Sequence, residues 1–259
     1  MNELWLDSIK KLYCALELGR RAVGVKLFRT EAEFEAAEAV SLKRPINYCQ
    51  MVAAATNGNC IKAKKNDFKC KSGERVLGID PADPKNSQGE NWARLGLYKD
   101  AETSGTIRKE LVYLTEPCYG LMVAPIEKLN EIPDAVILIV NAYNSMRLLQ
   151  GYAYSYGMPK SINMIGNQAI CLECTARPIG IKDLNTSMLC IGTRHRAGWK
   201  DDEMAVGIPG EQFIDVVNGL MNTLNQMEND SNKKIIEEKF KKEDIPFTIR
   251  YGYNYYMDC

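Results

Sequence analysis

Hydrophobic and polar positions along the chain follow two different periods, which predicts a fold that mixes helices and strands. Trp5, Ile9 and Leu12 recur at helical spacing and predict an amphipathic helix within residues 2–20. Residues 135–140 are an unbroken apolar run, the pattern of a strand buried on both faces. The same reasoning predicts further strands at 22–28, 111–114, 120–124, 204–209 and 247–256. It predicts further helices at 31–40, 45–56, 144–156, 212–227 and 228–243.

Two parts of the chain repeat this pattern in the same order. A strand, a helix, a cysteine-bearing turn and a second strand occur in residues 22–131 and again in residues 132–217. We expect an α/β or α+β fold, in which two similar, pseudo-symmetric halves share a mixed sheet with flanking helices. A helix at 1–21 would precede them, and a helix and closing strand at 218–259 would complete one compact unit. Thiols from both halves could then meet where the halves join, because binding sites often lie at such a junction.

Composition narrows the possible partners. The 259 residues carry 33 Lys and Arg against 33 Asp and Glu, so no overall charge attracts nucleic acid or an anionic membrane. No apolar run reaches the length of a membrane span, and the charged first 21 residues do not resemble a signal peptide. We expect a cytoplasmic protein with no membrane and no nucleic-acid partner. A homodimer stays open.

Cysteines are the main candidates for chemistry. There are nine, an odd number, and structural disulfides are rare in a reducing compartment. Cys171 and Cys174 are two residues apart, a spacing from which both thiols can reach one metal, and Cys190 follows. Buried core packing and a redox disulfide are the alternatives for this pair. Since the chain has a single histidine, His195, a bound metal would depend on thiolates.

The cysteine segments resemble a known family, domain-of-unknown-function family 169, over residues 22–215. The shared motifs include Cys49-Gln50 after a basic lead, Cys70-x-x-Gly73 ending in Leu77-Gly78, and Met146-Arg147-Leu148. The most specific joins Cys190-x-Gly192-x-Arg194 to an acidic pair and Gly207-Ile208-Pro209. The chain departs from the pattern at Lys71-Ser72, where Pro-Gly is usual. The resemblance implies a fold and a cysteine set formed by Cys49, Cys70, Cys171 and Cys190, but no reaction.

Four thiolates suit a cubane iron–sulfur cluster or a structural zinc site. Cys118 and Cys174 raise the candidate metal ligands to six: Cys49, Cys70, Cys118, Cys171, Cys174 and Cys190. Six is more than one simple site uses, so two are spectators, or a second or enlarged cluster is present. Cys14, Cys60 and Cys259 are predicted to be free thiols.

A group of basic residues begins four positions after Cys190 and contains the candidate catalytic residues. Arg194 and His195, with Arg196 beside them, could bind an anionic substrate or a cluster sulfide. Equally, they could face solvent or pair with the acidic residues at 201–203.

These observations support two functional hypotheses. The first is a cytoplasmic iron–sulfur protein in electron transfer or reductive chemistry, with a redox partner protein or a small-molecule substrate. The alternative is a zinc-stabilised, non-catalytic protein that binds or senses a small ligand.

Overall fold

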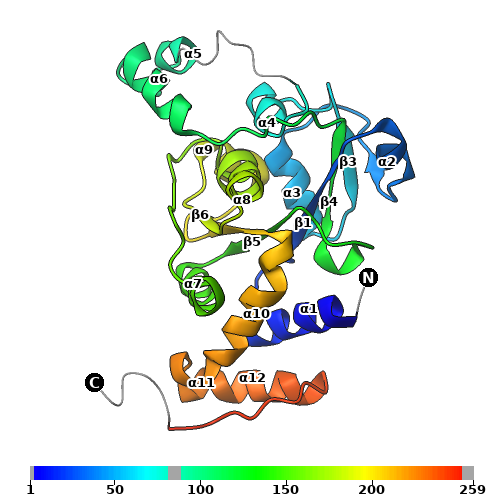
Figure 1. Ribbon diagram of the computed structural model, residues 1–259, viewed down its shortest axis with the longest axis vertical. Helices are drawn as coiled ribbons and strands as arrows, with labels where there is room; N and C mark the ends of the chain where they lie inside the picture. The colour runs from blue at the N-terminus through cyan, green and yellow to red at the C-terminus, as the bar shows by residue number, and fades with distance from the viewer. Residues whose placement is uncertain (1–2, 81–88, 253–259) are drawn as a thin grey trace.

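One mixed sheet runs through the middle of the molecule (Figure 1). The computed structural model describes residues 3–80 and 89–252. Within them, seven strands pair in the order β2-β3-β4-β1-β5-β7-β6, and only β2 and β3 run parallel. The strands are β1 Val23–Phe28, β2 Val40–Ser41, β3 Ile61–Lys64, β4 Gly120–Pro125, β5 Ala135–Val140, β6 Asn185–Ser187 and β7 Met204–Pro209.

Helices cover both faces of this sheet. One face carries α3 Tyr48–Thr56, α4 Lys71–Val76, η3 Ala169–Ala176, α8 Arg177–Ile181 and α9 Ile191–Ala197. The other carries α1 Glu3–Ala15, α7 Ala142–Tyr156, α10 Phe213–Asn222, α11 Leu224–Met227 and α12 Asp230–Lys242. The remaining helices are α2 Glu31–Ala36, α5 Glu90–Arg94, α6 Ala101–Glu110, η2 Ile126–Lys128 and η4 Gly210–Gln212.

Strand β5 shows why the sheet has two cores. All six of its residues are buried, and successive side chains enter opposite faces. Ile137 and Ile139 pack in the core beneath α3, whereas Val136 and Leu138 pack in the core beneath α7. The uninterrupted apolar run was therefore a correct sign of a strand covered on both sides.

The strands of the two halves are arranged alike in the sheet, whereas not all of their helices lie on the same face. β1 and β5 lie antiparallel at the centre, and β4 and β7 flank them on either side. Each of these outer strands ends at a proline, Pro125 or Pro209, and leads into a short 3-10 helix. The two helices that the predicted repeat pairs with each other, α3 and α7, pack on opposite faces of the sheet. The two halves thus share a strand order without sharing all their helices.

Some predicted elements differ from the structure. Residues 111–114 form no strand, because the Leu114 amide pairs with the Val76 carbonyl at the end of α4 instead of with a sheet. Residues 247–252 of the predicted closing strand also lie outside the sheet. Their backbone is held by the Asn225 side chain, which accepts from the Arg250 amide at 2.7 Å. The rest of that segment, Cys259 included, and most of the predicted loop at 80–90 lie outside the described residues.

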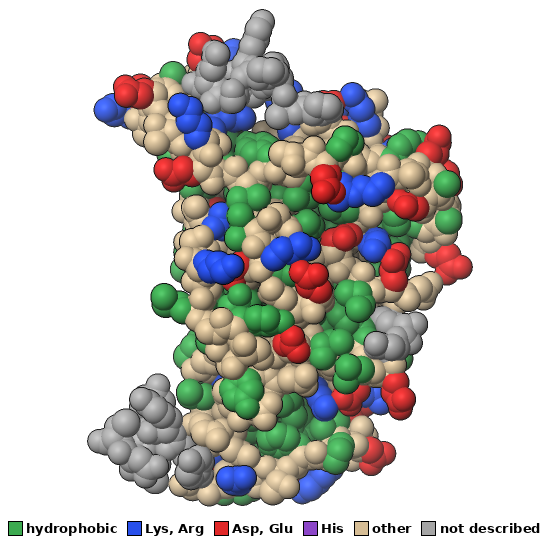
Figure 2. All heavy atoms as spheres, viewed as in Figure 1, with side chains coloured by type: hydrophobic (Ala, Val, Ile, Leu, Met, Phe, Trp, Pro, Cys, Tyr) green, Lys and Arg blue, Asp and Glu red, His purple; other side chains and the backbone are tan. Residues whose placement is uncertain are grey.

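Charges of both signs are mixed on the face of the molecule that Figure 2 presents. Figure 2 shows Lys and Arg side chains interspersed with Asp and Glu and with small hydrophobic patches on the face it presents, as the balanced composition predicts. In the described parts of the chain, no helix combines the length and the apolar character needed to cross a bilayer.

Candidate functional site

Four cysteines from the two halves stand where helices begin, on the same face of the sheet. Cys49 is the second residue of α3, Cys70 directly precedes α4, and Cys190 directly precedes α9. Cys171 is the third residue of η3. The first turn of a helix carries unpaired backbone N–H groups and a partial positive charge, which favour an anionic thiolate nearby.

Neighbouring thiols raise the pKa values of two of these cysteines, Cys49 and Cys171. Burial raises the pKa of Cys49 to about 11, and Cys190 and Cys70 add to the rise. Burial also raises the pKa of Cys171 far above its ordinary value, and the other three thiols contribute. These contributions indicate that the four thiols lie near one another, and α3 accordingly contacts α9 and η3, while α4 contacts η3.

Exposure differs among the four. Cys171 is 9% exposed, whereas Cys49, Cys70 and Cys190 are half-buried. Gly73 leaves space beside the buried thiol, because a Cβ atom there would lie 3.9 Å from the Cys171 sulfur. Cys171 therefore forms the floor of the site, and the three other thiols form its rim.

The thiols do not form a closed single-metal site as they stand. Across residues 3–80 and 89–252, no three His, Cys, Asp or Glu side chains are grouped as ligands of one metal ion. The eight cysteines described are all free thiols. The raised pKa values of Cys49 and Cys171 keep these two thiols protonated, and a nearby positive charge would favour their ionisation.

The two cysteines of the Cys-x-x-Cys pair, Cys171 and Cys174, lie on one helix of unusual geometry. η3 is a π-helix. Each residue of a π-helix rotates by a smaller angle about the helix axis than in an α-helix, so two side chains three positions apart point in more different directions. Cys174 is fully buried, and its pKa is raised by burial, Glu173 and Cys190 but not by Cys49 or Cys70. Its backbone packs on β7, where a Cβ on Gly207 would lie 2.3 Å from the Cys174 carbonyl oxygen. Cys174 is thus set back behind the rim.

Cys118 lies apart from the other five candidates. It lies two residues before β4, and its thiol donates to the carbonyl oxygens of Gly120 at 3.0 Å and Phe28 at 3.5 Å. Burial raises its pKa, and no other cysteine contributes. Its surroundings are those of a buried thiol bonded to the backbone.

The basic residues after Cys190 lie on α9 with different partners. The Arg194 guanidinium donates to the carbonyls of Met188, Glu203 and Lys200, which ties together the loops on either side of α9. His195 is exposed. Arg196, rather than Arg194, reaches the thiol helices, since it donates to Asn47 at the start of α3 over 3.2 Å.

Two supporting residues were missed by sequence reasoning. Glu173 is fully buried and accepts hydrogen bonds from the Ile165 amide at 2.7 Å and from the Ser187 hydroxyl. Tyr48, next to Cys49, bonds Thr175 of η3 at 3.1 Å. These bonds hold η3 to its neighbours on both sides. The signal was a lone acidic residue inside the apolar run that contains both cysteines.

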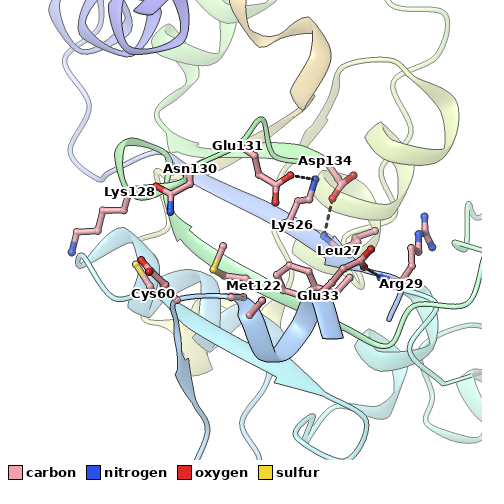
Figure 3. A pocket seen from close by; sticks show the side chains of 14 residues that line it. Lys26, Leu27, Arg29, Glu33, Cys60, Met122, Lys128, Asn130, Glu131 and Asp134 are labelled. Atoms are coloured by element: carbon pink, nitrogen blue, oxygen red, sulfur yellow. Dashed lines mark hydrogen bonds and ion pairs between the residues drawn. The ribbon is translucent and has the colours of Figure 1, made fainter. Parts of the chain in front are cut away.

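A cavity of about 640 Å³ lies elsewhere, beside β1 and β4 (Figure 3). Its charged groups already have partners: Lys26 pairs with Glu131 at 2.9 Å, and Asp134 accepts from the Leu27 amide at 2.7 Å. Cys60 lines it without another cysteine. Nothing in this cavity calls for a charged ligand.

Comparisons with known proteins agree with the motifs. The profile of the family described as "Uncharacterised ArCR" matches residues 11–219. The chain is 27% identical over 224 residues to the uncharacterised protein MJ0308 of Methanocaldococcus jannaschii, covering 85% of this chain and 94% of that protein. No solved structure gives a significant match. The chain therefore belongs to domain-of-unknown-function family 169.

Proposed function

We propose that this protein holds an iron–sulfur cluster through Cys49, Cys70, Cys171 and Cys190. With the cluster it would act in electron transfer or in reductive chemistry on a small molecule. The observation that carries the proposal is the placement of these four thiols, two from each half of the chain, at the starts of helices that contact one another on one face of the sheet.

The donor set suits the cofactor. Thiolates are the ligands that iron–sulfur clusters use, and the single histidine points to solvent. The raised pKa values of Cys49 and Cys171 mean that these thiols stay protonated on their own. Cationic iron would reverse that preference, because a coordinating thiol loses its proton. When bound, the cluster would supply one-electron transfer.

The chain's own residues would set the conditions around this centre. Cys171 would keep one side of it away from water, while the half-buried rim thiols leave it near the surface, where a redox partner can approach. Arg194 is close to Cys190 in sequence, and a fixed positive charge near a cluster favours its reduced, more negative state. Cys174 would lie behind Cys190, in the layer that supports the ligands.

Anaerobic purification followed by iron, zinc and acid-labile sulfide analysis tests the proposal. We expect a brown protein with iron and sulfide in comparable amounts. Cys171→Ser and Cys49→Ser should each lose most of the iron, because a missing thiolate leaves one iron open. Cys118→Ser is the matched control, and its iron content should stay that of the parent.

Two results would reject the cluster. Stoichiometric zinc without iron would instead favour a zinc-stabilised protein that binds a ligand. Equal metal content in the parent, Cys49→Ser and Cys171→Ser would place these thiols among ordinary packing residues.

A further inference from the structure

A second, smaller cavity carries three arginines and no acidic side chain. Its volume is about 220 Å³, and it lies between α4, α5, α6 and the residue that begins η3, at the end of the molecule where Figure 1 shows α5 and α6. The lining residues that matter here are Arg75, Trp92, Arg94, Arg108, Tyr113 and Gln168. Such a concentration of one charge contrasts with the mixed surface elsewhere.

Three buried polar atoms around this cavity lack a hydrogen-bond partner: Nε of Arg75, Nε of Arg108 and Oε1 of Gln168. The Tyr113 hydroxyl lies beside the Gln168 side chain, whose hydrogen bond opposes the rise of the Tyr113 pKa. Neither Arg75 nor Arg108 forms an ion pair with any described residue. Leaving a buried polar group unpaired costs about 1–3 kcal/mol, so folded proteins rarely do so without a reason. Three such atoms at one cavity indicate that a ligand supplies their hydrogen-bond partners.

The surrounding structure holds these groups in place. The Arg108 guanidinium stacks on the Trp92 ring at 4.7 Å, which orients its planar fork while leaving its charge unneutralised. Gln168 is 9% exposed and has a left-handed backbone, with φ 55°, at the turn into η3. The cavity is therefore formed by fixed side chains and not by freely moving surface arginines.

We propose that this cavity binds a small carboxylate that also carries a hydroxyl or amino group. Guanidinium forks match the two oxygens of a carboxylate, and the Tyr113 hydroxyl can donate a further hydrogen bond. The Gln168 oxygen only accepts, so the ligand itself has to bring a donor. The small volume limits the ligand to a compact molecule.

The cavity adjoins the thiol site. The Cys171 thiol donates to the Gln168 carbonyl oxygen at 3.6 Å. Burial raises the pKa of Tyr113; Arg108 opposes the rise and Cys171 adds to it. A bound carboxylate would therefore lie beside the floor of the thiol site. The lining of the proposed carboxylate site contains none of the four thiols, so carboxylate binding can be tested in metal-free protein.

Isothermal titration calorimetry of the metal-free, full-length chain with lactate, acetate and inorganic phosphate tests this site. Lactate should bind, and acetate, which lacks the hydroxyl, should bind at least tenfold more weakly. Arg75→Ala and Arg108→Ala should each weaken lactate binding at least tenfold. Arg21→Ala is the matched control: it removes the same charge from an exposed pair with Glu127 and should leave the affinity unchanged.

Tyr113→Phe keeps the ring and removes only the hydroxyl, so it tests the site even if an arginine variant fails to fold. It should weaken lactate binding without altering the circular dichroism spectrum. Three outcomes would overturn the proposal: no binding of lactate, equal affinity in the parent, Arg108→Ala and Tyr113→Phe, or binding of phosphate without lactate. Lactate binding is measured in metal-free protein, so it does not depend on whether the protein holds a cluster. The carboxylate proposal and the cluster proposal can therefore fail separately.

Discussion

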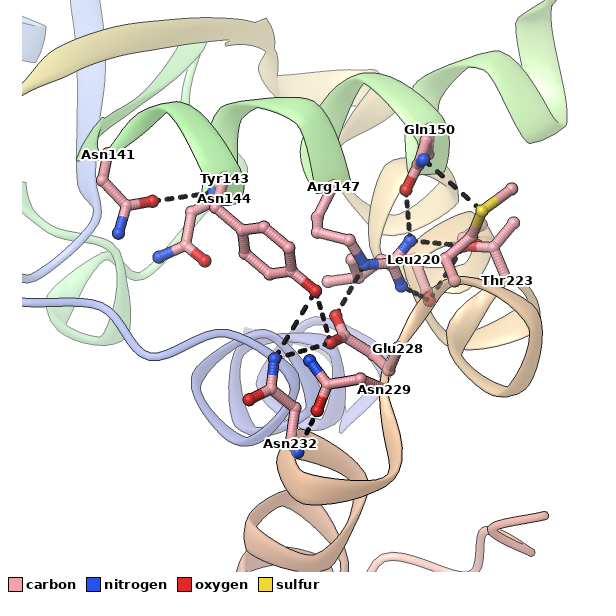
Figure 4. A network of polar contacts seen from close by, with 12 residues as sticks. Asn141, Tyr143, Asn144, Arg147, Gln150, Leu220, Thr223, Glu228, Asn229 and Asn232 are labelled. Carbon is pink, nitrogen blue, oxygen red and sulfur yellow. Dashed lines mark hydrogen bonds and ion pairs between the residues drawn. The ribbon is translucent and has the colours of Figure 1, made fainter. Parts of the chain in front are cut away.

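The Arg147 guanidinium forms an ion pair with the Glu228 carboxylate where neither is reached by water (Figure 4). Arg147 Nε lies 2.8 Å from Glu228 Oε1, and the two side chains are 1% and 2% exposed. Further donors on Arg147 reach Gln150 at 2.5 Å and the Leu220 carbonyl at 3.2 Å, and Tyr143 donates to Glu228 at 2.6 Å. This network joins α7 to α10 and to the start of α12.

Breaking this pair from one side should destabilise the fold strongly. Arg147→Ala leaves the Glu228 carboxylate buried without its main partner, a loss of about 3–5 kcal/mol in the free energy of unfolding. Urea denaturation of the parent and the variant measures it. Lys11→Ala, which breaks an exposed i,i+4 pair with Asp7, is the control and should cost less than about 1 kcal/mol. Equal losses in the two variants would contradict the structural role of the buried pair.

Gly207 should not tolerate a side chain. A Cβ there would lie 2.3 Å from the Cys174 carbonyl oxygen, so Gly207→Ala forces η3 and β7 apart. Such overpacking costs typically about 1–3 kcal/mol, which denaturation can detect. Gly19→Ala, with no atom within 4 Å of the added methyl group, is the matched control. If both variants unfold like the parent, η3 does not press on β7 as described.

Glu173 should make stability depend on pH. Burial raises its pKa above the ordinary 4.5, while Ser187 and the Ile165 amide oppose the rise. The unfolded chain therefore ionises first as pH rises, so this residue lowers stability from about pH 4.5 upward until the folded pKa is passed. Below the unfolded pKa both states are protonated, and the penalty vanishes.

Glu173→Gln separates this effect from the hydrogen bonds. Relative to the parent, the variant should gain stability as pH rises from about 4 to about 7, because it cannot ionise. Urea denaturation at both pH values gives the two differences. A difference between variant and parent that does not change with pH would show that Glu173 titrates normally.

Cys49 should react slowly in metal-free protein. With its pKa raised to about 11 by burial and the neighbouring thiols, it stays a neutral thiol near pH 8, and only the thiolate attacks iodoacetamide. Peptide-level mass spectrometry should show a rate that still rises about tenfold per pH unit beyond pH 9. Cys190→Ser removes one of the charges that raise this pKa, so it should speed the reaction. A rate that levels off near pH 8.5 in both proteins would contradict the convergence of these thiols.

The inner face of α7 differs from the apolar spacing of its sequence. That spacing favours Met146, Leu149, Tyr152, Ala153 and Tyr156 as the inner face. Tyr152 is buried, but Met146, Ala153 and Tyr156 are exposed, and Arg147, Leu148 and Gly151 are buried. The reason is close contact with α10: a Cβ on Gly151 would lie 2.5 Å from the Val216 carbonyl oxygen. A helix face formed by Gly151 and Arg147 shows no apolar pattern in the sequence. Burial of Arg147 is favourable because it pairs with Glu228, which lies far along the chain.

Local pattern in the sequence was enough to predict the central strands, since β1, β4, β5 and β7 match apolar runs whose burial follows from that pattern. Motifs likewise singled out Cys49, Cys70, Cys171 and Cys190 as candidate ligands. The fold sets Cys118 and Cys174 apart from these four, because a sheet carbonyl accepts from one thiol and a π-helix turns the other away. The arginine cavity likewise depends on the fold. Its unpaired atoms come from positions 75 to 168, and neither burial nor a missing partner can be read from residues that are distant in sequence.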